Sequence, residues 1–140
     1  RVKKLVTWAA VSDFGNRFPR GKKLEQWKKD GVYYIVNGRT KQKMPHYIQF
    51  YEDFLANQKK LHIKTATQEL KIPFLIIHGT QDESVDVQEA EILFDNSTSS
   101  TLKWIANANH VFGMKHPWEQ ENVPLQTEIL ISESLNFLNQ

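Results

Sequence analysis

Two residues of the types used in acid–base catalysis follow two consecutive predicted strands. Asp82 lies in HGTQDESVD, three residues after Gly79, and His110 lies in IANANHVFG, after a predicted strand at 101–105. Functional groups in open α/β sheets gather at the carboxyl ends of strands, and adjacent parallel strands lie about 5 Å apart. We therefore expect the two side chains to meet at one edge of a sheet.

A carboxylate beside an imidazole has a definite chemical use. When it accepts a hydrogen bond from Nδ1–H, it fixes the tautomer of the ring and stabilises the imidazolium. The Nε2 atom is then free to act as a general base toward a hydroxyl or water. The residues around His110 are small, which predicts space for a substrate over the ring: Ala106, Asn107, Ala108 and Asn109.

Three segments predict the strands that position this pair. Residues 5–11 and 73–79 are continuous apolar runs, typical of parallel strands covered on both faces, and 101–105 predicts the next strand. The first strand has no crossover partner before it, and three strands make a thin sheet. We therefore expect the sheet to be incomplete in this chain.

Helices are predicted after the second and third strands. Asp86 and Glu89 form an Asp-x-x-Glu capping signature, and the following helix has Val87, Ala90, Leu93 and Phe94 on one face. Pro124 opens a C-terminal helix with Ile131, Leu135 and Leu138 on one side. Strands and helices in this order predict right-handed crossovers, and so an α/β fold with a parallel sheet and flanking helices.

Residues 15–69 differ from the rest, because they are polar, basic and interrupted by Gly and Pro. Residues 32–42 predict a short β segment turned at Asn37-Gly38. Helical spacing of apolar residues predicts a helix over 45–60, and a short helix is expected at 61–69. The aromatic side chains here either pack the segment onto the core or line an acyl or aryl pocket: Trp27, Tyr33, Tyr34, Tyr47, Phe50, Tyr51 and Phe54.

The stretch IPFLIIHGTQDESVDVQEAEILFDNSTSSTLKWIANANHVFG, residues 72–113, resembles the C-terminal part of the α/β-hydrolase family. The resemblance is greatest to the dienelactone hydrolase and serine aminopeptidase branch, which includes acyl esterases. It implies that Asp82 is the acid and His110 the base of a catalytic triad. It further implies a core strand region at 1–14, a mainly helical lid inserted at 15–69, and a core carrying acid and base at 70–140.

The family's nucleophile has no match in this chain. The Gly-x-Ser-x-Gly elbow, which precedes the acid and base in chain order, is absent, and Ser12 lacks the flanking glycines. Ser84 and the group Ser97, Ser99 and Ser100 lie in predicted loops. We therefore expect the nucleophile to lie upstream of residue 1 and the chain alone to be inactive.

Other acidic and histidine residues receive different interpretations. Glu83 is one residue from the family position, and Asp86 is better explained as a helix N-cap. We expect His78 to support the acid loop from the end of its strand, and His116 to be structural or a surface group. No closely spaced pair of metal ligands is present among these residues, so we predict no metal and no cofactor.

Composition excludes several other classes of function. The 140 residues include no cysteine, which rules out disulfides and a cysteine nucleophile and is compatible with the cytoplasmic location that we expect. No apolar run approaches the roughly 20 residues of a membrane span. Residues 1–69 carry 15 Lys and Arg against 6 Asp and Glu. We interpret this as a solvated basic face rather than a nucleic-acid surface, because no nucleic-acid motif accompanies it.

The sequence thus predicts part of a serine hydrolase that cleaves carboxylic esters or small amides. Two alternatives stay open: a dehalogenase- or epoxide-hydrolase-type enzyme with an aspartate nucleophile, and a non-catalytic binding protein of the same fold. The open edge of the first strand predicts pairing with the missing half of the hydrolase, with a second copy, or aggregation.

Overall fold

Two stretches of chain that are distant in sequence fold together around one sheet. The computed structural model describes residues 2–38 and 40–140. The chain divides into one unit made of Arg1–Ser12 with Ile63–Gln140, and another made of Asp13–His62. The candidate acid and base both lie in the first unit.

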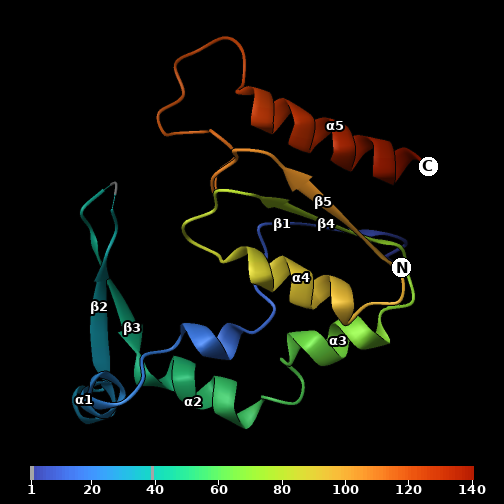
Figure 1. Ribbon diagram of the computed structural model, residues 1–140. Helices are drawn as coiled ribbons and strands as arrows, with labels where there is room; N and C mark the ends of the chain where they lie inside the picture. The colour runs from blue at the N-terminus through green and yellow to red at the C-terminus, as the bar shows by residue number, and fades with distance from the viewer. Residues whose placement is uncertain (1, 39) are drawn as a thin grey trace. The chain divides into compact units, whose positions relative to one another are not determined.

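The sheet of the first unit is parallel, with its central strand fully buried. Strands β1 (Leu5–Trp8), β4 (Phe74–Gly79) and β5 (Ser100–Ile105) pair in the order β1-β4-β5 within the described chain (Figure 1). Every residue of β4 is buried. This confirms the predicted α/β fold with a parallel sheet.

Helices cover both faces of this sheet. Side chains of a strand alternate between the faces, so Leu75 and Ile77 pack in the cluster that includes Leu130 of α5 (Leu125–Asn139). Phe74 and Ile76 pack on the other face in a cluster with residues of α4 (Val87–Asp95) and α3 (Ile63–Glu69). In Figure 1, α5 lies on one side of the strands, and α3 and α4 lie on the other.

Two details of the sequence interpretation are wrong at the periphery of this unit. The first strand ends at Trp8 and does not reach residue 11, because Ala9 takes a left-handed conformation with φ of 48°. On α5 the predicted side of Ile131, Leu135 and Leu138 is exposed, and the buried side carries Thr127, Leu130 and Ser134. The small polar side chains can be buried because they bond to groups elsewhere in the unit, as when Trp8 Nε1 donates to Ser134 Oγ at 2.9 Å.

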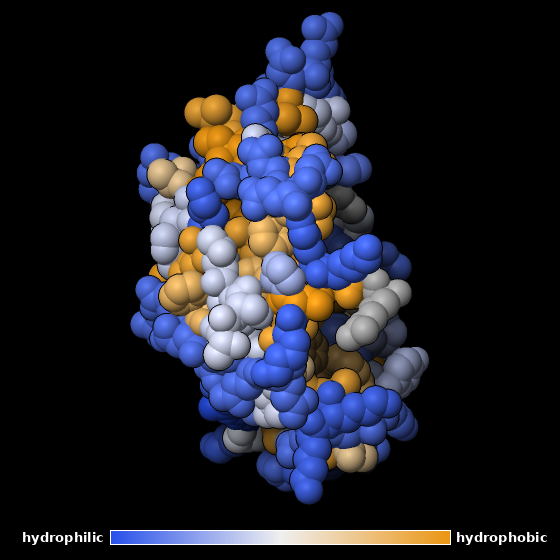
Figure 2. Space-filling view, turned by 90° about the vertical axis from the view of Figure 1, so that its right-hand side faces the viewer, coloured by the Kyte–Doolittle hydropathy of each residue, from blue (hydrophilic) through white to orange (hydrophobic). Residues whose placement is uncertain are grey.

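Apolar side chains also reach the surface. Figure 2 shows several such patches between polar side chains. The exposed fractions of Leu135 and Leu138 are 52% and 48%. Among the helices of the described residues, none combines the length and the apolar character that a membrane crossing requires.

The N-terminus of α4 holds the end of the first stretch of chain. Asp86 is the N-cap as predicted, and its Oδ1 accepts from Gln88 N–H at 2.9 Å. Glu89 does not complete a capping box. Its carboxylate accepts instead from the backbone N–H of Ser12 at 2.6 Å and from the Ser12 hydroxyl. Glu89 therefore fixes the last residue before the chain enters the second unit.

The second unit has its own hairpin and its own aromatic core. It contains a 3-10 turn (Phe14–Arg17), α1 (Lys22–Asp30), β2 (Val32–Val36), β3 (Lys43–Tyr47) and α2 (Ile48–Ala56). The β2–β3 pairing is antiparallel. The helix predicted over 45–60 is therefore too long, because residues 45–47 satisfy their backbone groups in the hairpin.

The buried side chains of this unit are mostly aromatic. Phe18, Trp27 and Ile48 form a buried cluster, with Tyr33 and Tyr51 packed against it. The Trp27 indole also donates to the carbonyl of His46 at 2.8 Å, which attaches α1 to the hairpin. Some of the aromatic residues of this segment therefore build an internal core, whereas Tyr34, Tyr47 and Phe50 are exposed. The interpretation of residues 15–69 as a lid stays a prediction.

Candidate active site

The structure brings Asp82 and His110 into direct contact. Nδ1 of His110 lies 2.9 Å from Oδ2 of Asp82. The Asp82 side chain is fully buried, whereas that of His110 is 42% exposed. An ionised carboxylate only accepts hydrogen bonds, so Nδ1 carries the proton and Nε2 is the basic nitrogen. The partly exposed ring can offer Nε2 to a reactant.

The acid is held by its own loop. Oδ1 of Asp82 accepts from the backbone N–H of Ser84 at 2.8 Å and of Val85 at 2.9 Å. Burial acts to raise the pKa of Asp82. The hydrogen bonds from Val85, His110 and Ser84, with the charge of His110, outweigh burial and hold the pKa below its ordinary value. The carboxyl group is therefore kept ionised beside the imidazole.

A second histidine touches the acid from the strand side. Nε2 of His78 lies 3.0 Å from the carbonyl oxygen of Val85 and 3.3 Å from Oδ2 of Asp82. This agrees with the expectation that His78 supports the acid loop. The sequence analysis did not predict the contact of His78 with the carboxylate itself. The two residues are only four positions apart in the sequence, which was the one signal available for it.

The loops that carry acid and base are tied to one another. Gln81 N–H donates to the carbonyl of Ala108 at 2.9 Å, and Asn107 N–H donates to Thr80 Oγ1 at 2.9 Å. The side-chain amide of Gln81 donates to Asn107 Oδ1 at 3.2 Å. These links were missed in the sequence, because nothing local marks Gln81 and Asn107 as partners.

The histidine loop is stabilised by bonds within it and to α5. Asn109 Oδ1 accepts from the N–H groups of Val111 and Gly113, and the Thr127 hydroxyl donates to the carbonyl of Phe112 at 2.7 Å. Ala108 is fully buried. It packs in the core beneath the loop, and the space for a substrate over the ring stays a prediction.

Three of the serines considered as nucleophiles have hydroxyl groups bonded elsewhere: Ser12, Ser99 and Ser100. Ser12 is 2% exposed and its hydroxyl bonds Glu89. Ser99 and Ser100 are at the start of β5, and their hydroxyls donate to backbone carbonyls. Because His110 follows the end of β5, Ser99 and Ser100 lie at the opposite end of the strands from it.

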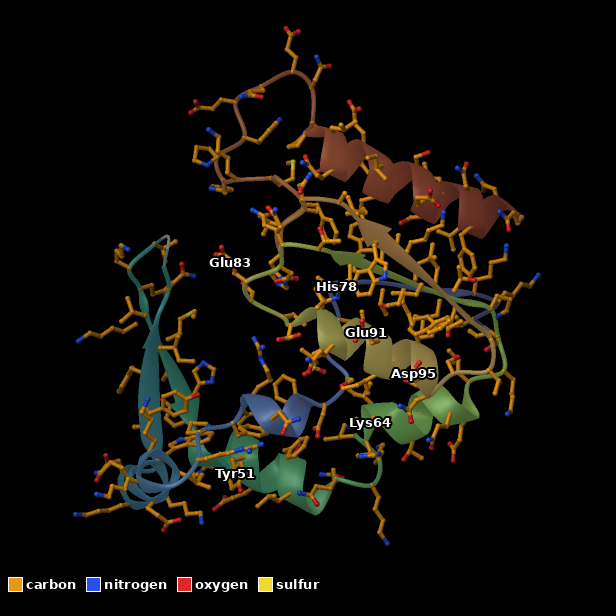
Figure 3. All side chains as sticks on the ribbon, in the orientation of Figure 1. Tyr51, Lys64, His78, Glu83, Glu91 and Asp95 are labelled. Atoms are coloured by element: carbon orange, nitrogen blue, oxygen red, sulfur yellow. The ribbon has the colours of Figure 1, made fainter. Side chains whose placement is uncertain are left out.

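The rival acids lie on the same loop but face elsewhere. Glu83 is exposed, and Figure 3 shows it on the outer bend of the loop between β4 and α4. Asp86 is occupied as the N-cap of α4. Within the described residues, no group of three or more His, Asp or Glu side chains could hold a metal ion.

The comparisons with known proteins point to one fold. No protein-family model matches the chain. Over 86 residues it is 27% identical to the monoacylglycerol lipase ABHD6 of Rattus norvegicus, and this match covers 59% of the chain and 26% of the lipase. A crystal structure of a serine hydrolase involved in carbazole degradation, the CarC enzyme, is similar with a TM-score of 0.51 at 15% identity, covering 99% of this chain and 54% of that one.

An esterase domain from a Rhodothermus marinus protein gives a TM-score of 0.49 at 15% identity, over 79% of this chain and 43% of that domain. The chain thus spans about a quarter of the length of the rat lipase and about half of the CarC enzyme. The likeness to the CarC enzyme shows the fold: residues 1–140 form part of an α/β-hydrolase fold.

The contact between the two loops predicts a strict size limit at residue 79. A Cβ added at Gly79 would lie 2.3 Å from the carbonyl oxygen of Ala108. Backbone on both sides leaves little room to relax, so Gly79→Ala should destabilise the fold by about 1–3 kcal/mol. Urea unfolding measures this effect. Gly38→Ala, at a site with open space around it, is the control, and equal midpoints for the two variants would contradict the prediction.

The pKa of Asp82 predicts how stability responds to acid. The unfolded chain binds a proton at this residue near pH 3.9, and the folded chain binds it only at lower pH. As pH falls through this window the unfolded state binds more protons, so the stability contributed by the ionised carboxylate is lost. The difference in unfolding free energy between wild type and Asp82→Asn should therefore shrink from about pH 6 to about pH 3.

Urea titrations at several pH values measure this difference. Glu83→Gln, which removes the adjacent exposed carboxylate, controls for the change in net charge. A difference between wild type and Asp82→Asn that stays constant over the whole pH range would show that Asp82 contributes nothing through its charge.

Proposed function

We propose that residues 1–140 form the acid–base part of a serine hydrolase that cleaves carboxylic esters or small amides. The observation that carries the proposal is the bond of 2.9 Å between a fully buried Asp82 and a half-exposed His110. The nucleophile is a serine on a segment outside these residues. The similarity to a monoacylglycerol lipase supports an ester as the substrate class.

In this reaction His110 moves the proton and Asp82 keeps the ring in place. Nε2 takes the proton of the serine hydroxyl while the serine oxygen attacks the carbonyl carbon. The same proton passes to the leaving alcohol or amine as the carbonyl reforms, which produces an acyl-enzyme. Water then repeats the sequence: Nε2 takes its proton while the water oxygen attacks the acyl carbon, the bond from that carbon to the serine oxygen breaks, and the serine oxygen takes the proton from Nε2 as the acid product leaves.

The arrangement of charges around the ring supports this role. Through Nδ1–H, Asp82 stabilises the imidazolium that forms in each half of the reaction. The lowered pKa of Asp82 keeps the proton on the imidazole, so the carboxylate does not compete for it.

We also propose that the unit of residues 13–62 is the lid of this enzyme, in the branch similar to dienelactone hydrolases and serine aminopeptidases.

The first test is kinetic. In the natural protein that carries residues 1–140 together with the nucleophile, His110→Gln and Asp82→Asn should each lower kcat by about 10³–10⁴-fold. The first variant removes the base, and the second removes the acceptor that sets its tautomer. His116→Gln, at an exposed histidine, is the matched control. Full activity in His110→Gln would overturn the proposal.

The second test concerns the origin of the nucleophile. Residues 1–140 on their own should neither hydrolyse p-nitrophenyl butyrate nor react with a fluorophosphonate probe, because the proposed nucleophile lies outside them. The longer protein should do both, and mass spectrometry should locate the label on a serine outside residues 1–140. A stoichiometric label within residues 1–140 would contradict this assignment.

A further inference from the structure

His78 is a buried imidazole that the proposed proton transfers do not use. It is 0% exposed and stands next to the last residue of β4. Its partner in the register is Trp104 on β5, and the two rings pack at 6.1 Å in an edge-on arrangement. A polar ring at such a position is costly unless its hydrogen bonds are specific.

The surroundings of the ring determine where its proton lies. Nε2 faces two oxygen atoms that can only accept, the carbonyl of Val85 at 3.0 Å and Oδ2 of Asp82 at 3.3 Å. Nδ1 is buried and has no hydrogen-bond partner within residues 2–38 and 40–140. The proton therefore belongs on Nε2, which donates it to the Val85 carbonyl at the end of the acid loop, with the acid itself in contact beside it.

Both oxygens of Asp82 are held, and the ring of His78 lies against one of them. Two backbone amides donate to Oδ1, from Ser84 and Val85. Two imidazoles approach Oδ2, His110 from the solvent side and His78 from the strand side. Donors on both oxygens oppose rotation of the carboxylate about its Cβ–Cγ bond. Because His78 is part of the central strand, it transmits the rigidity of the sheet to the acid.

We infer that His78 is a positioning residue: its Nε2–H, donated to the Val85 carbonyl with the ring against Asp82 Oδ2, fixes the acid loop and so holds the carboxylate in the orientation that receives the proton of His110 Nδ1. This inference rests on the proposed function. His78 acts through Asp82 and does not touch substrate. Its loss should therefore lower kcat and leave KM nearly unchanged.

The decisive variants are His78→Leu and His78→Gln in the natural protein that carries the nucleophile. Leucine fills much of the buried volume and removes the donor. Glutamine carries a side-chain N–H close to the position of Nε2. We expect His78→Leu to lower kcat by roughly 10-fold, as the loss of one buried hydrogen bond at the acid loop allows. We expect His78→Gln to recover most of that loss.

A spectroscopic signal separates positioning from simple stability. In the wild type, ¹⁵N NMR should show His78 protonated at Nε2 and a downfield proton on Nδ1 of His110. That downfield proton should move upfield in His78→Leu and return in His78→Gln. Thr67→Val is the control, because Thr67 is buried and its hydroxyl donates to the carbonyl of Ile63 on α3. It should lower stability and leave both kcat and the His110 proton unchanged.

The outcomes are distinct. Wild-type kcat in His78→Leu would overturn the inference, as would equal losses in both His78 variants with an unmoved His110 proton. If His110→Gln retains activity, the proposed function fails instead. The NMR comparison still reports on the link from His78 to Asp82 and His110 in that case, because it does not depend on turnover.

Discussion

The parallel register of β4 with β5 is the constraint on which the candidate site depends. His78 stands opposite Trp104, and Gly79 stands opposite Ile105, so the two strands end at the same level. The loops that follow therefore start side by side at one edge of the sheet. Asp82 comes three residues after one strand end and His110 five residues after the other. A slip of the register would separate the carboxylate from the imidazole by the rise of a residue, about 3.3 Å.

Electrostatics explains why the acid can be buried at this edge. A carboxylate without partners in such a place would become neutral. The backbone amides of the tight loop after Asp82, together with His110, instead favour its ionised form. The loop thus does two things with the same bonds: it closes its own turn and it keeps a negative charge under the ring of His110. That charge is what a general base needs when it becomes an imidazolium.

The parts of this arrangement that follow from local patterns could be predicted, and the parts set by tertiary contacts could not. The continuous apolar runs predicted the strands of the parallel sheet, and the N-cap Asp86 predicted α4. The positions of Asp82 and His110 after consecutive strands predicted that their side chains meet. The exposed side of α5 was misjudged, because Thr127 and Ser134 are buried through bonds to distant groups. Residues 45–47 were assigned to a helix, because pairing with β2 is not visible in their own pattern. The Gln81–Asn107 link was missed for the same reason.

The geometry of acid and base is set within a short part of the chain. The bonds that position Asp82 and His110 come from the strand ends and loops of residues 78–113, with one further bond from Thr127 of α5. None of the bonds just named involves residues 13–62, which form a unit with an aromatic core of its own. These contacts, which orient Asp82 and His110, therefore lie within one unit. A nucleophile outside these residues has to meet one geometric requirement, which is to come within hydrogen-bond distance of Nε2 on the partly exposed ring of His110.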